Sequence, residues 1–484
     1  MPDRAKNQVV ILHGWSDTSD SFASLAKFLE ARSFRILDLF LADYISMDDD
    51  VSIEDAAKAM QAAVQAKIAA TELKPPFDLI VHSTGGLVAR TWLSAYCAGM
   101  NSGQMPVQRL VMIAPANFGS KLADVGQTIL GRVVKGWDHG FHTGKLMLDS
   151  LALGSPFHWD LASRDLFASD AGDAAPVYGG ELVWPFVIVG SMPYQHGLRQ
   201  MVNESGSDGT VRVAAANLNA YGATLDFTRD QAPTVMRMTG GAASVDAAQG
   251  ALIPWKRNYD EAMAFPLAVM AHRDHASITD PTILGDGETV EQQAQFRNCM
   301  LDALGCISYA RYQELQQAWR RLSDAVQDPA SADADHHMHL QINVRVVDEH
   351  GKPVTDYMIE FLAPNYAQNT DLTGLFHDKV IKDVHKNGQD ASVRTIYIDR
   401  QRLFELFYVQ IPAGQPKELR LSISATSPGD NVKYFADAFG GKGEFVVHSQ
   451  DQADRWLQRN ATHFLKIVIP RIPSEDVFRL KHPA

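Results

Sequence analysis

Ser83 is the side chain with the clearest chemical context in this sequence. It stands in the run Val-His-Ser-Thr-Gly-Gly at residues 81–86, between an apolar segment that predicts a strand and a segment that predicts a helix. A serine on a sharp turn between strand and helix is presented to substrate, and the helix N-terminus stabilises negative charge that develops beside it. We therefore expect Ser83 to be a nucleophile rather than an ordinary helix N-cap.

The run at residues 81–86 resembles the nucleophile elbow, G-x-S-x-G, of the lipase and esterase branch of the α/β-hydrolase superfamily. Val81 departs from that pattern, because it replaces the family's first glycine. The resemblance implies a serine mechanism that needs no metal or organic cofactor, with Ser, Asp/Glu and His following in that order. It also implies two oxyanion donors, the backbone N–H groups of Trp15, in the run His-Gly-Trp, and of Thr84.

The acid that this order requires is expected at Asp208. The run Ser-Asp-Gly-Thr-Val at residues 207–211 resembles the acid-bearing segment of lipases. An Asp-Gly pair is also common in ordinary turns, and Asp226 and Asp230 are weaker alternatives. Residues 114–120, Ala-Pro-Ala-Asn-Phe-Gly-Ser, resemble a further lipase segment and support the family without supplying a catalytic group.

The base is expected at His275. A serine hydroxyl becomes nucleophilic when a histidine accepts its proton, and a carboxylate must hold that histidine. The run Asp-His-Ala-Ser-Ile at residues 274–278 follows the last strand expected in the core and resembles the histidine segment of the family. His272 lies at the end of that strand, and we expect it to be structural because the base must reach the serine from the loop that follows.

Apolar runs that alternate with amphipathic segments predict the framework for these residues. Strands that alternate with helices indicate a mostly parallel sheet with helices on both faces. The expected strands cover residues 9–12, 34–41, 77–81, 110–114, 184–190 and 265–271, and the main expected helices cover 21–31, 53–70, 86–97 and 309–326.

Two further regions depart from this alternation. Residues 117–181 are expected to form an inserted cap with short helices, whose aromatic residues form either a lid over an apolar acyl pocket or an ordinary buried core. Beyond a polar linker the sequence period changes to two, which predicts a C-terminal β-sandwich over residues 338–484. We therefore expect an α/β-hydrolase domain at residues 1–327 and an accessory β-domain. The strands expected there cover residues 339–347, 358–362, 395–398, 406–411, 419–423 and 464–469.

Charge and targeting signals narrow the class of partner. The 484 residues carry a formal net charge of −13 and no long Lys/Arg run, which disfavours nucleic acid and simple electrostatic attraction to anionic lipid. Contact with a membrane surface would have to be mainly apolar. The N-terminal apolar run at residues 9–12 is too short for a signal peptide, so a cytoplasmic location is expected by default, and export by a signal-free route stays open.

These features together predict a lipase, phospholipase or carboxylesterase acting on lipid or small esters. Two other classes stay open at this stage. The bulky Val81 favours a non-catalytic binding or scaffold protein with a hydrolase fold. A fluorophosphonate probe would distinguish this protein from an active hydrolase, because an inactive serine does not react with it. An acyltransferase using the same residues would be recognised by an added alcohol that outcompetes water as acyl acceptor.

Overall fold

The computed structural model contains two compact units. It describes residues 8–15, 17–32, 39–125, 144–168, 175–195, 200, 203–228, 250–260, 263–327, 337–434, 443–448 and 457–482. Residues 1–220 and 256–338 form the first unit, and residues 221–255 and 339–484 form the second.

A parallel six-stranded sheet forms the centre of the first unit, in the order β2-β1-β3-β4-β5-β8. Three of its strands, β1, β3 and β5, are mainly apolar and buried at every residue, as a sheet covered on both faces requires. The strands are β1 (Val9–Leu12), β2 (Leu39–Ala42), β3 (Phe77–His82), β4 (Val107–Ile113), β5 (Trp184–Gly190) and β8 (Leu267–Met270).

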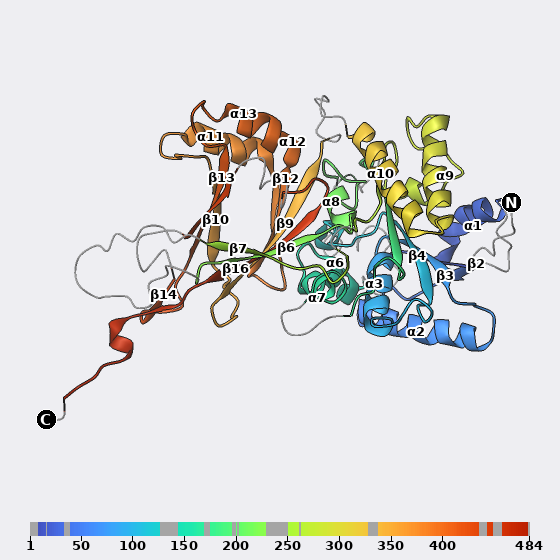
Figure 1. Cartoon of the computed structure of the whole chain (residues 1–484), viewed down its shortest axis with the longest axis horizontal. Coiled ribbons are helices and arrows are strands. Elements are labelled where there is room, and N and C mark those ends of the chain that lie inside the picture. Colours follow the sequence, from blue (N-terminus) through green and yellow to red (C-terminus); the bar gives the residue numbers. More distant parts are fainter. Residues whose placement is uncertain are drawn as a thin grey trace, which may run out of the picture. The chain divides into compact units, whose positions relative to one another are not determined.

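Helices cover both faces of this sheet, as the alternating pattern predicts. In Figure 1, α2 and α3 lie on one side of the strands, and α1, α9 and α10 lie on the other. Capping boxes begin two of them, with Ser52 and Asp55 at α2 and Thr289 and Gln292 at α9. The helices are α1 (Ala23–Glu30), α2 (Ile53–Ala69), α3 (Gly85–Tyr96), α9 (Val290–Leu304) and α10 (Tyr309–Val326), with the shorter η1 (Ser19–Phe22), α8 (Val213–Ala216) and η5 (Ser277–Thr279).

Short helices occur where a cap was expected: α4 (Leu122–Val125), α6 (Lys145–Leu151) and α7 (Pro156–Asp165). A fully buried ion pair joins the last of these to α3, because Arg90 binds both carboxylate oxygens of Asp165 at 2.8 and 3.0 Å. Aromatic residues of the expected cap such as Trp137 and Phe141 lie outside the described residues. None of the helices in the described ranges has the length and apolar composition that crossing a bilayer demands.

Two sheets of the second unit share one apolar core, whose side chains come from β9, β10, β12, β13 and β16. The larger sheet has the order β11-β12-β9-β16-β6-β7 and the smaller one β10-β13-β15. The expected β-rich C-terminal region is therefore present, with β16 parallel to both of its neighbours. The strands are β6 (Tyr221–Asp226), β7 (Ala251–Pro254), β9 (His339–Asp348), β10 (Tyr357–Leu362), β11 (Ile381–Lys386), β12 (Val393–Asp399), β13 (Glu418–Ala425), β15 (Gly443–His448) and β16 (Thr462–Ile469), and a separate two-stranded sheet contains β14 (Val432–Lys433) and β17 (Ile472–Pro473).

The second unit differs from the sequence-based expectation in two places. Residues 221–255 were expected within a continuous domain 1–327, but β6 and β7 extend the larger sheet of the second unit. Residues 406–411 were expected to form a strand, but η8 (Leu403–Phe407) and α13 (Tyr408–Gln410) are helical. Phe407 and Tyr408 of this segment are buried in the core, so its apolar run reflects burial and not strand geometry. The remaining short elements are α11 (Thr370–Leu375), η7 (Phe376–Val380), α12 (Arg400–Arg402) and η9 (Glu475–Val477).

Candidate active site

Ser83 lies on the turn between β3 and α3 with a backbone φ of +51°, a left-handed conformation that a residue with a side chain rarely adopts. Such a residue costs about 1–3 kcal/mol and persists when its surroundings hold it. Its N–H donates to the Ile113 carbonyl at 3.1 Å, and its carbonyl accepts from the Gly86 N–H at 3.0 Å. The turn therefore has the strained geometry of a nucleophile elbow.

Small residues beside the turn allow this close approach. A Cβ added to Gly14 would lie 2.8 Å from the Ser83 Cβ, and a Cβ on Gly85 would lie 2.6 Å from the His13 carbonyl oxygen. Val81, by contrast, lies inside β3 and is fully buried, with Leu12 and Met112 as its strand partners. The loss of the family's first glycine at position 81 therefore leaves the left-handed turn at Ser83 intact.

A line of hydrogen bonds joins Ser83, His275 and Asp208, which come from three distant parts of the sequence. The Ser83 Oγ lies 3.0 Å from His275 Nε2, and His275 Nδ1 lies 2.8 Å from Asp208 Oδ2. The Asp208 side chain is fully buried, whereas Ser83 and His275 retain 9% and 8% of their exposure. The hydroxyl is thus at the accessible end of the line and the carboxylate at its buried end.

The surroundings of Asp208 determine which nitrogen of His275 carries the proton. The other carboxylate oxygen, Oδ1, accepts from the backbone N–H groups of Thr210 at 2.9 Å and Val211 at 2.7 Å. Oδ2 is thereby directed at His275 and acts as an acceptor, so Nδ1 must be the donor of that bond. Nε2 of the neutral imidazole then has a lone pair for the Ser83 hydroxyl proton.

The weaker candidates from the sequence have other surroundings. Asp226 belongs to β6 in the second unit, where its Oδ1 accepts from the N–H and the hydroxyl of Thr228 at 2.8 and 2.6 Å. Asp230 lies outside the described residues. His272 has a φ of +61°, and its Nδ1 lies 3.0 Å from the Asp286 carbonyl oxygen, within its own loop.

Arg273 organises the loop that carries His275, although no sequence motif marks it. Its guanidinium is fully buried and donates to the carbonyls of Ser277 at 2.7 Å, Asp280 at 2.9 Å and Ile283 at 2.8 Å. It also pairs with the buried carboxylate of Glu288, at 2.9 Å from Nε and through a second bond from Nη2. One side chain thus ties the loop together around the histidine.

Arg273→Ala is expected to lower the free energy of unfolding by about 3–5 kcal/mol, because it leaves the Glu288 carboxylate buried without its cation. Urea denaturation of the purified full chain measures this change. Arg311→Ala is the matched control, since that guanidinium is 44% exposed, and exposed pairs contribute about 0–1 kcal/mol. Adding Glu288→Gln to the first variant should restore part of the loss. Equal losses for the two arginine variants would contradict this role.

The two expected oxyanion donors belong to the segments that follow β3 and β1. Thr84 directly follows Ser83 and is the N-cap residue of α3, and Trp15 follows β1. His13 Nε2 accepts the Tyr44 N–H at 3.1 Å, so its Nδ1 carries the proton that is donated to the Gly14 carbonyl at 2.7 Å. This buried ring, stacked on Tyr44 at 4.5 Å, holds the backbone immediately before Trp15.

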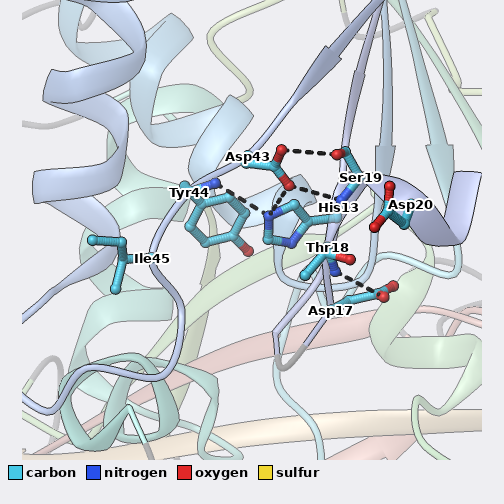
Figure 2. A pocket seen from close by; sticks show the side chains of 8 residues that line it. All are labelled: His13, Asp17, Thr18, Ser19, Asp20, Asp43, Tyr44 and Ile45. Carbon is cyan, nitrogen blue, oxygen red and sulfur yellow. Dashed lines mark hydrogen bonds and ion pairs between the residues drawn. The ribbon is translucent and has the colours of Figure 1, made fainter.

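A cavity of about 500 Å³ lies beside His13, between the segments that follow β1 and β2 (Figure 2). It has a polar, acidic wall, to which Asp17, Asp20 and Asp43 contribute, and Asp43 accepts two hydrogen bonds from Ser19 at 2.7 and 2.8 Å. Pockets for apolar ligands are lined mainly by hydrophobic side chains. Ile45 and the Tyr44 ring also line this cavity, but its three carboxylates make it a poor site for an acyl chain.

Known proteins share the fold of this chain but have little sequence similarity to it. A domain of unknown function, DUF7379, matches residues 2–130. No curated protein matches the sequence. The phospholipase PlaB from Legionella pneumophila matches 98% of this chain and 97% of its own with a TM-score of 0.73 and 23% identity. This chain has the α/β-hydrolase fold. Further matches are PlaB in complex with thio-NAD, with a TM-score of 0.72, 23% identity and the same coverage, and the mature lipase BlEst2 from Bacillus licheniformis, with a TM-score of 0.33 and 20% identity over 45% of this chain and 82% of that one.

The α/β-hydrolase fold accounts for the way the site is assembled. Parallel strands place their carboxyl ends at one edge of the sheet, and Ser83 and His275 follow two of these ends, those of β3 and β8. Asp208 follows β5, which lies between β4 and β8. The loops after β3, β5 and β8 therefore come together at this edge. The similarity to PlaB also covers the β-rich unit.

Proposed function

We propose that this chain is a serine hydrolase that cleaves the carboxylic ester bonds of lipids. The observation that carries the proposal is the unbroken line from the Ser83 hydroxyl through His275 to the buried carboxylate of Asp208, at 3.0 and 2.8 Å. A hydroxyl, an imidazole and a carboxylate in this order are the groups that acyl transfer requires. The strained elbow supports the same role, because strain of this kind concentrates at functional sites.

In this mechanism the Ser83 Oγ attacks the ester carbonyl carbon while His275 Nε2 takes the hydroxyl proton. Asp208 holds the ring and stabilises the imidazolium that forms. The N–H groups of Trp15 and Thr84 bind the oxygen that becomes negative, and each such donor contributes about 3 kcal/mol to the transition state. His275 returns the proton to the departing alcohol. Water then attacks the acyl group while His275 takes a proton from it, and His275 passes that proton to the Ser83 Oγ as the fatty acid leaves.

Phospholipids are the substrate class we propose. The fold is shared with a protein named as a phospholipase over 98% of this chain, including the β-rich unit. The cavity beside His13 has an acidic wall, so we expect the acyl chain to bind elsewhere at the carboxyl edge of the sheet. The net charge of −13 favours apolar over electrostatic contact with a lipid surface.

A fluorophosphonate probe and a panel of esters test the proposal on the purified full chain. The probe is expected to modify Ser83, located by mass spectrometry, because only an activated serine reacts with it. Phosphatidylcholine and phosphatidylglycerol vesicles, a triglyceride emulsion and p-nitrophenyl acetate are then compared for release of fatty acid or nitrophenol. Hydrolysis of vesicle lipid above the other two supports a phospholipase. Preference for the short ester would remove the lipid assignment, and an unlabelled Ser83 would remove the hydrolase.

A further inference from the structure

His82 is the buried imidazole next to the nucleophile, and the proposed mechanism does not use it. It is the last residue of β3 and is 6% exposed. Its Nε2 lies 3.2 Å from the backbone carbonyl oxygen of His275, and the centroids of the two rings are 4.7 Å apart. The Phe22 ring also packs against His82 in a T-shaped contact, with the ring centroids 5.8 Å apart. The His82 ring therefore contacts both the main chain and the side chain of the proposed base.

The protonation state of His82 follows from these contacts. A carbonyl oxygen only accepts, so the Nε2 of His82 must carry the proton and donate it to His275. Nδ1 is buried and meets no hydrogen-bond partner among the described residues, which excludes a second N–H at that atom. Burial lowers the pKa of His82 well below its usual range, and the nearby His275 acts in the same direction. The ring is thus neutral, with one donor and one orphaned lone pair.

The orphaned nitrogen lies on the side of the loop that carries an expected oxyanion donor. A Cβ on Gly14 would lie 3.3 Å from His82 Nδ1, and Gly14 immediately precedes Trp15. The His82 ring thus lies between two loops. Its Nε2 faces the loop of the proposed base, and its Nδ1 faces the loop of an expected oxyanion donor. Burying a polar atom without a partner costs about 1–3 kcal/mol, so packing alone would favour an apolar residue here.

We propose that His82 is a positioning residue, which fixes the His275 imidazole against Ser83 through its bond to the His275 carbonyl and its ring contact. This inference rests on the proposed function, because it gives His275 the role of base. His82 itself touches no substrate. Its neutral ring also leaves the neighbouring imidazolium, which forms during acyl transfer, without a second positive charge beside it.

Three substitutions at position 82 separate positioning from packing. His82→Leu keeps an apolar side chain of similar bulk and removes the donor. His82→Gln is the conservative variant, because its amide Nε2 extends as far as the imidazole Nε2 and can donate to the same carbonyl. His82→Asn is equally polar but shorter, so its amide cannot reach that oxygen. The readouts are kcat and KM on the best ester of the panel, the rate of fluorophosphonate labelling, and the melting temperature.

A displacement of about 1 Å at a reacting group lowers rates by roughly 100-fold. We expect His82→Leu and His82→Asn to lose roughly 30- to 100-fold in kcat and in labelling rate, with KM unchanged. His82→Gln should recover to within about fivefold of the unsubstituted chain, since it restores the same donor. The melting temperature of His82→Leu should change little, because removing the orphaned Nδ1 offsets the loss of the bond to the His275 carbonyl. Full labelling of His82→Leu, or Gln and Asn variants of equal rate, would overturn the inference.

Imidazole NMR of histidine-labelled full chain gives a readout that does not need activity. In the unsubstituted chain the His82 resonances should show a neutral ring at neutral pH and a midpoint well below that of an ordinary histidine. The His275 resonances should shift in His82→Leu and return toward their original positions in His82→Gln. Unchanged His275 resonances in His82→Leu would refute the positioning role even for an active enzyme. An unlabelled Ser83 with shifted His275 resonances would refute the proposed function and leave the contact established.

Discussion

Ser83→Ala is expected to lower kcat by about 10⁵- to 10⁶-fold on whichever ester the enzyme prefers. The substitution removes the hydroxyl oxygen that lies 3.0 Å from His275 Nε2, and no covalent acyl intermediate can then form at this position. Any remaining rate comes from the oxyanion donors acting on water, which in a comparable hydrolase leaves about 10³–10⁴-fold over the uncatalysed reaction. Steady-state hydrolysis of vesicle lipid, with active-site titration by fluorophosphonate, measures the loss.

The fold of Ser83→Ala should be retained, because alanine has the same Cβ at the strained turn. Ser94→Ala is the matched control: Ser94 lies on α3, the helix that follows the elbow, and its hydroxyl donates to the Thr91 carbonyl at 3.2 Å. We expect this control to retain full activity. A Ser83→Ala protein as active as Ser94→Ala would place the nucleophile elsewhere and end the proposed mechanism.

Asp208→Asn is expected to lower kcat by about 10⁴-fold, as the same change does in the serine protease from which this magnitude is taken. Two backbone N–H groups, of Thr210 and Val211, donate to Asp208 Oδ1 at 2.9 and 2.7 Å. An asparagine must therefore turn its carbonyl oxygen toward them and its NH₂ group toward His275. The Nδ1 of His275 then has to accept, its proton moves to Nε2, and the lone pair that should take the Ser83 proton is lost.

The measurement is kcat for Asp208→Asn beside Asp226→Asn, the other acid within the described residues that the sequence left open. The Asp226 carboxylate accepts from Thr228, so its substitution should leave kcat unchanged. Imidazole NMR adds a direct observation, because the proton on the His275 ring should move from Nδ1 to Nε2 in the first variant only. Equal kcat values for both variants would exclude Asp208 as the orienting acid.

The local elements of the first unit follow from sequence pattern. The apolar runs that predicted strands near residues 9–12 and 184–190 coincide with β1 and β5, and the amphipathic run at 309–326 coincides with α10. The pattern that predicts each of these elements is local. A helix shows apolar residues three or four positions apart, and a buried strand shows a continuous apolar run. Period and composition therefore suffice to predict them, and with them the parallel α/β sheet.

Pairing over long sequence distances could not be predicted in this way. β6 pairs in parallel with β16, more than 200 residues later, and the sequence of β6 does not indicate which strand it will pair with. The segment 406–411 has an apolar run that suits a strand, yet burial in the core accommodates it as a helix. Residues 221–255 therefore belong to the second unit because β6 pairs with β16, and the sequence of the segment alone does not show this pairing.

The sequence by itself determined which residue types were available for acyl transfer and in what order they follow: a serine after a strand, then an acid, then a histidine. Only the tertiary structure decided that Asp208 Oδ2 and not Asp226 faces His275, and that His272 bonds within its own loop. It also showed that the buried donors of Arg273 and His82 meet backbone carbonyls, with the Glu288 carboxylate as a further partner of Arg273. Every residue carries a carbonyl, so a sequence does not show which one a buried donor will meet.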